Sequence, residues 1–315
     1  MVTNRLLVRA ANVFLLGLLA AGCGSGVVTD ASEGRTGASD PRGGGSNSRS
    51  ADDDGEWSWS TPEPISLETL MEAGHLRVEA GTEGRTEVSV QPSDPERRHD
   101  VETAEETTVR MQDETLTIET PQRPVSWDMP GSIEVRVVLP ADSDVNVRVS
   151  IADVETTGRL DRVELKSSAG DLNVDQAAEA VLGTAAGAVR VGHAAGPVEI
   201  GTSGGDVTVE EAAASVSAET TSGDVVVEEA ADSVSAQTTG GAIRLGSVRR
   251  GEVVVGSTGG DIHIGVADGV PAWLDVDSLG GQVRPRIDPV SEADDAAVTI
   301  RAHSTGGDID VAPGR

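Results

Sequence analysis

Residues 205–222 read GDVTVEEAAASVSAETTS and residues 223–240 read GDVVVEEAADSVSAQTTG, so one unit is repeated almost residue for residue. The glycine that opens each unit recurs at nearly constant intervals, and only the last two intervals, from 260 to 281 and from 281 to 307, are clearly longer. A fixed period of this kind is typical of a solenoid, in which each repeat forms one coil. These glycines are Gly170, Gly187, Gly205, Gly223, Gly241, Gly260, Gly281 and Gly307.

Each unit contains two short segments in which apolar and polar residues alternate. In the first quoted unit, Val207 and Val209 flank Thr208, and the alternation resumes at Val216 after a bend. A period of two directs one set of side chains inward and the other toward solvent. Glycine pairs at most of these turns disfavour helix. The pattern predicts an all-β solenoid with about 18 residues per coil, whose coils rise roughly 4.8 Å each.

The turn between units carries the pattern Thr-x-Gly-Gly-Asp, as at residues 202–206. We expect its glycines to adopt positive φ and its aspartate to hydrogen-bond the backbone of the turn that it starts. Calcium-binding β-rolls also use Gly-Gly-Asp, but in a nine-residue repeat. The turn aspartates here are interrupted by Ala188, Ala242 and Gln282. We therefore expect solvated turn residues and no calcium or other metal ligands.

A less regular β region precedes the repeats. We expect it to form N-terminal coils or a cap over residues 63–150, because an uncapped coil exposes a strand edge. The solenoid repeats then occupy residues 151–315. The candidate strands of the N-terminal region are His75–Ala80, Glu87–Gln91, Thr107–Met111, Leu116–Glu119 and Ser132–Leu139.

The N-terminus has the organisation of an export signal. Two arginines precede an apolar run at residues 10–22, which is too short for the roughly 20 residues that span a bilayer. The run ends in LAAG before Cys23, the chain's only cysteine. This resembles a lipobox and predicts a lipoprotein signal peptide over residues 1–22 and lipidation of Cys23. A plain secretory signal with an incidental cysteine is the alternative.

Residues 23–62 have the composition of a linker. Glycine, serine, aspartate and arginine dominate, and so little apolar surface predicts disorder. Trp57 and Trp59 close this segment, and we expect them to dock on the edge of the following domain, because large rings are usually buried.

The overall charge excludes one class of partner. Acidic residues outnumber basic ones by 53 to 24, which gives a net charge of −29. Such a chain repels phosphate backbones, so we expect no nucleic-acid partner. Aromatic residues make up only 2% of the chain, so its core must consist of aliphatic side chains.

Several segments, taken in order, resemble one known family. They are ETLTI from Glu114, VRVVLPADS from Val135, WLDVDSLGG from Trp273 and AHSTGGDIDV from Ala302. Together with the Gly-Asp repeats they resemble the DUF4097 β-strand-repeat family, whose members are described as candidate adhesins, over roughly residues 65–313. The resemblance implies a right-handed parallel β-helix-like fold and a cell-envelope location, and it implies no catalytic residues or cofactor.

Few residues stand out as chemical candidates. The five histidines show no metal-ligand spacing. Arg249-Arg250 is a basic pair that fits a solvated loop better than an anion site. Residues 283–295 form a proline-containing acidic insertion, which we expect to be a contact loop because solenoid insertions emerge on one face.

Anchor, spacer and repeats together predict a membrane-anchored lipoprotein on the extracytoplasmic face of the cell membrane. We expect it to act by binding an envelope protein or polysaccharide, as an adhesin or scaffold, and not as an enzyme. One alternative is a component of an envelope-stress sensor or regulator. A second is a carbohydrate-active enzyme on a β-helix, although no catalytic set can be singled out among 53 acidic residues.

Overall fold

The computed structural model describes residues 55–81, 84–122 and 130–314. Its one α-helix, α1, spans Arg98–Glu106, and a 3-10 helix, η1, spans Ala293–Asp295. None of the helices in the described ranges is long and apolar enough to cross a bilayer. The strands are β1 (Glu56–Thr61), β2 (Ser66–Ala80), β3 (Gly84–Pro92), β4 (Thr108–Gln112), β5 (Thr115–Glu119), β6 (Ile133–Leu139), β7 (Asp144–Ala169), β8 (Leu172–Ala186), β9 (Val189–Ala194), β10 (Val198–Thr202), β11 (Val207–Ala212), β12 (Val216–Glu219), β13 (Val225–Ala230), β14 (Val234–Thr238), β15 (Ile243–Val248), β16 (Gly251–Ser257), β17 (Ile262–Val266), β18 (Ala272–Ser278), β19 (Val283–Pro285), β20 (Val298–Ser304) and β21 (Ile309–Pro313).

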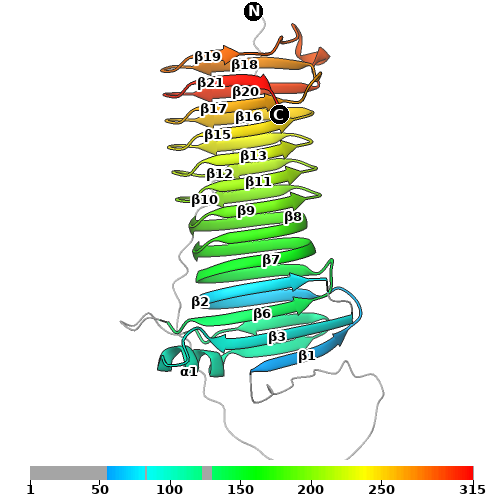
Figure 1. Ribbon diagram of the computed structural model, residues 1–315, viewed down its shortest axis with the longest axis vertical. Helices are drawn as coiled ribbons and strands as arrows, with labels where there is room; N and C mark the ends of the chain where they lie inside the picture. Colours follow the sequence, from blue (N-terminus) through cyan, green and yellow to red (C-terminus); the bar gives the residue numbers. More distant parts are fainter. Residues whose placement is uncertain (1–54, 82–83, 123–129, 315) are drawn as a thin grey trace, which may run out of the picture. The chain divides into compact units, whose positions relative to one another are not determined.

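The repeats stack as coils whose strands form two parallel ladders (Figure 1). One ladder runs through β9, β11, β13, β15 and β17, and the other through β10, β12, β14 and β16. Val207 lies beside Val225 in the first ladder, and Val216 lies beside Val234 in the second. In both pairs the partners are the equivalent residues of consecutive units, so the register confirms the predicted all-β stack of coils with this repeat.

The core lies between the two ladders and is aliphatic. Val207, Val209, Val216 and Ala218 are all at most 2% exposed, whereas Thr208 between the first two is half-buried. Each fully buried valine or leucine contributes about 1.5–3 kcal/mol through removal of apolar surface from water. Small and β-branched side chains fill the narrow space between the sheets, so the near absence of aromatic residues costs the fold little.

The turn glycines are required by close packing of successive coils. A Cβ on Gly223 would lie 1.9 Å from the carbonyl oxygen of Gly205, the equivalent residue of the preceding coil. Among the eight turn glycines, all of which the structure describes, only Gly170 and Gly187 have positive φ, of 131° and 139°. The expectation that these turn glycines adopt positive φ is therefore wrong for most of them. At those positions glycine is needed because the backbone of the preceding coil leaves no room for a side chain.

The threonine or serine three residues before each glycine explains the rest of the turn motif. Thr220 is 3% exposed, accepts a hydrogen bond from the backbone N–H of Gly223 at 3.2 Å, and donates to the carbonyl of Gly205 at 3.1 Å. The hydroxyl thus fixes its own turn and ties it to the preceding coil. Thr238 and Ser257 repeat this arrangement.

The turn aspartates connect coils as well. Asp206 Oδ1 accepts the backbone N–H of Asp224 at 2.9 Å, and Asp224 Oδ1 accepts the backbone N–H of Ala242 at 2.7 Å. The carboxylate therefore bonds the turn of the next coil, and not its own turn as predicted. The bond is favourable because turn N–H groups at a sheet end lack strand partners.

The last two coils are stacked out of sequence order. Strand β20 pairs with β16 on one side and with β18 on the other, and β21 likewise lies between β17 and β19. In sequence, the coil of β18 and β19 comes before the C-terminal coil of β20 and β21. In space, the C-terminal coil lies between it and the coil of β16 and β17 (Figure 1). The two lengthened intervals at the end of the glycine series reflect this stacking order. The predicted insertion at residues 283–295 contains β19 and η1, and the segment after β19 carries the chain back to β20.

The N-terminal part of the stack departs from the simple repeat. Strand β2, which contributes to two coils, pairs in parallel with β5, β6 and β7, and the predicted boundary at residue 150 falls inside β7. Strand β3 adds antiparallel to β6, β1 adds antiparallel to β3, and β4 adds antiparallel to β5. The five predicted strands of this region are all present with small shifts at their ends, except that β2 begins well before His75, at Ser66.

Two elements of this region were not expected. Residues 56–61, placed in the linker, form β1, because the alternating tryptophans give one buried face that composition alone does not reveal. Helix α1 occupies a polar segment without an apolar stripe, and only Asp100 and Thr103 of the helix are buried. The carboxylate of Asp100 accepts the backbone N–H of Ser132 at 3.0 Å, which ties the helix to the residue before β6.

Candidate functional site

Most candidates from the sequence have structural partners. Arg249 pairs with Glu229 at 2.8 Å and Arg250 lies 3.6 Å from Asp232, so the basic pair belongs to surface ion pairs. The segment after β19, predicted as a contact loop, leads the chain back to β20. Within it, Val290 donates its backbone N–H to the carbonyl of Ala272. Cys23, the predicted lipidation site, lies outside the described residues.

The five histidines lie apart along the stack, each beside a carboxylate. Across the described ranges, no group of three or more histidine, cysteine, aspartate or glutamate residues is placed to hold a metal ion. The pairs are His75 with Asp153, His99 with Glu102, His193 with Glu211, His263 with Asp310 and His303 with Asp277.

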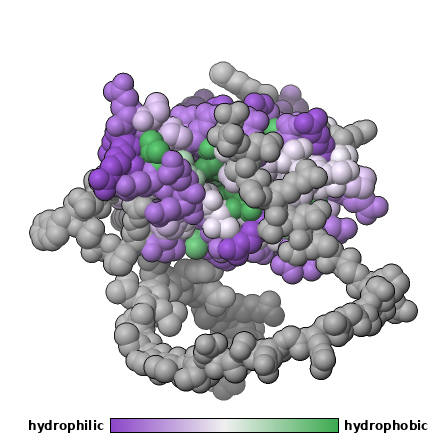
Figure 2. Space-filling model, turned by 90° about the horizontal axis from the view of Figure 1, so that it is seen from below, coloured by the Kyte–Doolittle hydropathy of each residue, from purple (hydrophilic) through white to green (hydrophobic). Residues whose placement is uncertain are grey.

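The tryptophan pair lies at the N-terminal end of the stack. Trp59 is 8% exposed and packs in the core, and Trp57 is half-buried against it, as expected for docked rings. Figure 2 shows hydrophobic residues in the middle of this end with hydrophilic residues around them. A hollow of about 610 Å³ lies here between Trp59, Met111 and Ile65.

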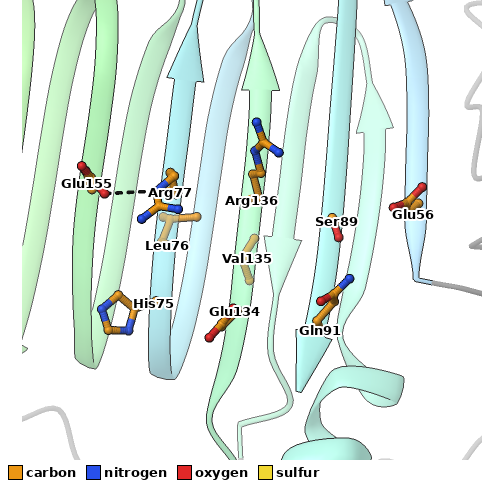
Figure 3. A pocket seen from close by; sticks show the side chains of 10 residues that line it. All are labelled: Glu56, His75, Leu76, Arg77, Ser89, Gln91, Glu134, Val135, Arg136 and Glu155. Carbon is orange, nitrogen blue, oxygen red and sulfur yellow. Dashed lines mark hydrogen bonds and ion pairs between the residues drawn. The ribbon is translucent and has the colours of Figure 1, made fainter. Parts of the chain in front are cut away.

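A second hollow lies on the outer surface above this end and is lined mostly by polar and charged residues. It has a volume of about 610 Å³, and its walls come from β1, β2, β3, β6 and β7 (Figure 3). An adjoining hollow of about 320 Å³ shares three of its residues and continues it toward Arg85 and Trp57. The larger hollow is lined by Glu56, His75, Leu76, Arg77, Ser89, Gln91, Glu134, Val135, Arg136 and Glu155.

Two arginines lie at the centre of this polar hollow. Arg77 and Arg136 are directly opposite each other on β2 and β6, which would be destabilising without compensation. Arg77 Nε donates to Glu155 at 3.1 Å, and Arg136 donates to both carboxylate oxygens of Glu79 at 3.0 and 2.7 Å. The hydrogen bonds and charge of Arg136 hold the pKa of Glu79 below its usual value.

The arginines keep donors for a ligand. Among the described residues, Arg77 uses only Nε in its ion pair, which leaves its terminal N–H groups open, and the side chain is 57% exposed. Ser89 and Gln91 add neutral polar groups from β3, and Glu134 adds a carboxylate from β6 (Figure 3). Donors and acceptors of both charges in one hollow suit a polar ligand rich in hydroxyl groups.

Sequence reasoning did not find this site, and no local signal marks it. His75 and Glu134 become Cα partners although they lie far apart in the chain. The hollow depends on the antiparallel addition of β3 and β1 beside the parallel stack, which has no counterpart in the regular repeat.

Several solved structures are similar to most of this chain. Two described as a "putative adhesin", from Parabacteroides distasonis and from Bacteroides fragilis, share 16% and 13% identity, with 81% of this chain and 95% of each of those chains covered and TM-scores of 0.40 and 0.37. A "putative cell adhesion protein" from Clostridium sporogenes shares 10% identity, with 82% and 98% covered and a TM-score of 0.20. No curated protein matches. The family model described as Toastrack DUF4097 matches residues 66–312, so the chain belongs to this family.

Proposed function

We propose that this chain is a lipoprotein of the cell envelope, anchored through Cys23 on the extracytoplasmic face of the membrane, that acts by binding through its stacked coils. The polar hollow around Arg77 and Arg136 carries the proposal, because it combines open donors and acceptors on a rigid sheet surface. Rigid strands lower the entropic cost of presenting such groups to a ligand.

The anchor is supported by sequence. Residues 19–22 and Cys23 form the lipobox-like segment after a short apolar run, and residues 23–54 provide a polar spacer before β1. As a flexible coil, that spacer would separate the membrane and the coils by roughly 30 Å. The right-handed sense of the coil, which the family resemblance implied, stays a prediction.

The anchor is tested by Cys23→Ser in the native host. We expect the variant to leave the membrane fraction or to keep its unprocessed mass, whereas the unchanged chain has the mass of the lipidated form. Unaltered fractionation and mass in the variant would contradict lipidation.

The binding role is tested by a photo-crosslinking residue placed at Gln91, which is exposed and lines the hollow. Gln237, exposed on the other ladder, is the matched control because it carries the same side chain. We expect a specific envelope component to be captured in cells from position 91 and not from position 237. Equal capture at both positions, or none, would argue against a binding role for this hollow.

A further inference from the structure

From β2 to β19, four arginines recur at every third strand along one outer face. Arg136 on β6 lies at the same register position beside Arg77, where it is paired with Glu79. Arg77 on β2, Arg190 on β9, Arg244 on β15 and Arg284 on β19 occupy the same register position, connected through successive Cα partners. The two strands between each pair carry Glu155 and Asn173, Thr208 and Val226, and His263 and Asp310. Strands lie roughly 4.8 Å apart, so the four guanidinium groups recur about every 14 Å.

This even spacing cannot be read from the chain. The sequence numbers of the four arginines, 77, 190, 244 and 284, are unevenly spaced. The last arginine reaches its place only because the C-terminal coil is inserted between β17 and β19. We call these four residues the arginine row.

Within their own coils, the two inner arginines of the row have small residues on both sides, and the nearest carboxylates belong to adjacent coils. Arg190 lies between Ala188 and Gly192 at the adjacent outward positions of its strand, where equivalent coils carry aspartate and glutamate. Arg244 lies in the same way between Ala242 and Gly246. Within the described part of the chain, neither arginine makes an ion pair, and both are exposed.

The two coils between Arg190 and Arg244 are acidic on this outer face. Their outward positions carry Asp206 just before β11 and Glu210 on it, and Asp224 just before β13 and Glu228 on it. A hollow of about 490 Å³ lies beside them, lined by both glutamates and reaching Gly192 next to Arg190. Carboxylates accept hydrogen bonds from hydroxyl groups, so these coils suit an uncharged, hydroxyl-rich stretch of ligand.

We propose that the arginine row binds a linear acidic polysaccharide along the stack, with one anionic group on each arginine and neutral sugar units over the intervening coils. This rests on the proposed function and names its ligand class. A densely charged polymer such as nucleic acid, with one charge per roughly 1.7 Å, would bring most of its charges against the carboxylates. A protein partner would need an apolar centre, and the outward positions of this face are mostly polar.

Galacturonan of graded methyl esterification tests the proposal with the full chain. We expect tightest binding when two of every three carboxyls are esterified, because the free carboxylates then recur near the spacing of the row. The fully esterified polymer should bind more weakly through loss of charge, and the unesterified polymer more weakly through repulsion. Tightest binding of the unesterified polymer would overturn the proposal.

Two variants separate the row from general charge. R190Q/R244Q should weaken binding about tenfold or more, whereas R110Q/R148Q should leave it within about twofold. The second variant removes two exposed arginines of the other ladder that make no ion pair among the described residues. The exchange R190T/T208R keeps the composition but moves one guanidinium to the next strand, and should weaken binding severalfold. Circular dichroism confirms folding in each case.

The outcomes also separate this proposal from the broader one. Equal binding by R190Q/R244Q and R110Q/R148Q, or unchanged binding by R190T/T208R, would overturn the arginine row as a site. Position-specific crosslinking from Gln91 together with no galacturonan binding would leave the binding role intact and overturn the ligand class alone.

Discussion

The backbone N–H of Asp308 donates a 2.8 Å hydrogen bond to the carboxylate of Asp261, 47 residues earlier in the chain. The same bond joins turns only 18 residues apart elsewhere, as between Asp224 and Asp206. The C-terminal coil is therefore a regular member of the stack in space although it is the last in sequence. The coil formed by β18 and β19 is attached to the stack only through it among the described strand pairings.

Removing residues 298–315 should detach the coil that contains β18 and β19. Its strands lose their paired partners β20 and β21, so we expect the amides of Ala272–Ser278 to exchange rapidly with deuterium while those of β13 remain protected. Hydrogen exchange read by mass spectrometry checks this. Retained protection of β18 would show that it can stack directly on β16, and would contradict a strict dependence on the C-terminal coil.

Gly223→Ala should destabilise the chain by about 1–3 kcal/mol, because its Cβ would lie 1.9 Å from the carbonyl oxygen of Gly205 and overpacking forces backbone shifts. Gly201→Ala is the matched control, since a Cβ there meets nothing within 4 Å. Urea unfolding measures both. Equal losses of stability in the two variants would refute the explanation that the turn glycines are required by close packing of successive coils.

The sequence predicts the coils well because their determinants are local. Alternation such as Val207, Thr208 and Val209 sets the inward face, and a glycine at each turn marks the period. Both signals depend only on neighbouring residues and on the contact with the next identical turn. The length of chain in each coil therefore follows from the sequence without knowledge of the stacking order.

The stacking order and the candidate sites do not follow from the sequence, for one physical reason. Coils with the same inward pattern are interchangeable as neighbours: Val253 pairs with Ile300, and Ile300 pairs with Leu274, by the same aliphatic contacts. Nothing local in Arg284 shows that its coil is last in space. The polar hollow likewise depends on a pairing, that of Arg77 with Arg136, which the insertion between β2 and β6 separates in sequence.

Thr220→Val should cost about 1–3 kcal/mol, because the substitution leaves the carbonyl of Gly205 and the N–H of Gly223 without their buried hydroxyl partner. Thr156 is equally buried, but its hydroxyl has no hydrogen-bond partner among the residues that the structure describes. Thr156→Val should therefore be neutral or stabilising. Urea unfolding of the two variants separates a bonded from an unbonded hydroxyl, and a reversed order of stabilities would contradict the turn bonding described here.

Glu79→Gln should make stability less dependent on pH in the acidic range. Because Arg136 lowers the pKa of Glu79 in the folded chain below the value of 4.5, folding favours the ionised carboxylate. Its contribution is fully present above that value and is lost as the pH falls through the lowered pKa of the folded state. The effect is small because the pair is largely solvent-exposed.

The control for this pH dependence is Glu63→Gln, since Glu63 is exposed and makes no ion pair among the described residues. Urea midpoints measured from neutral pH to about pH 3 should fall less steeply for Glu79→Gln than for Glu63→Gln and the unchanged chain. Three superimposable profiles would show that the pairing of Glu79 with Arg136 contributes nothing to folding.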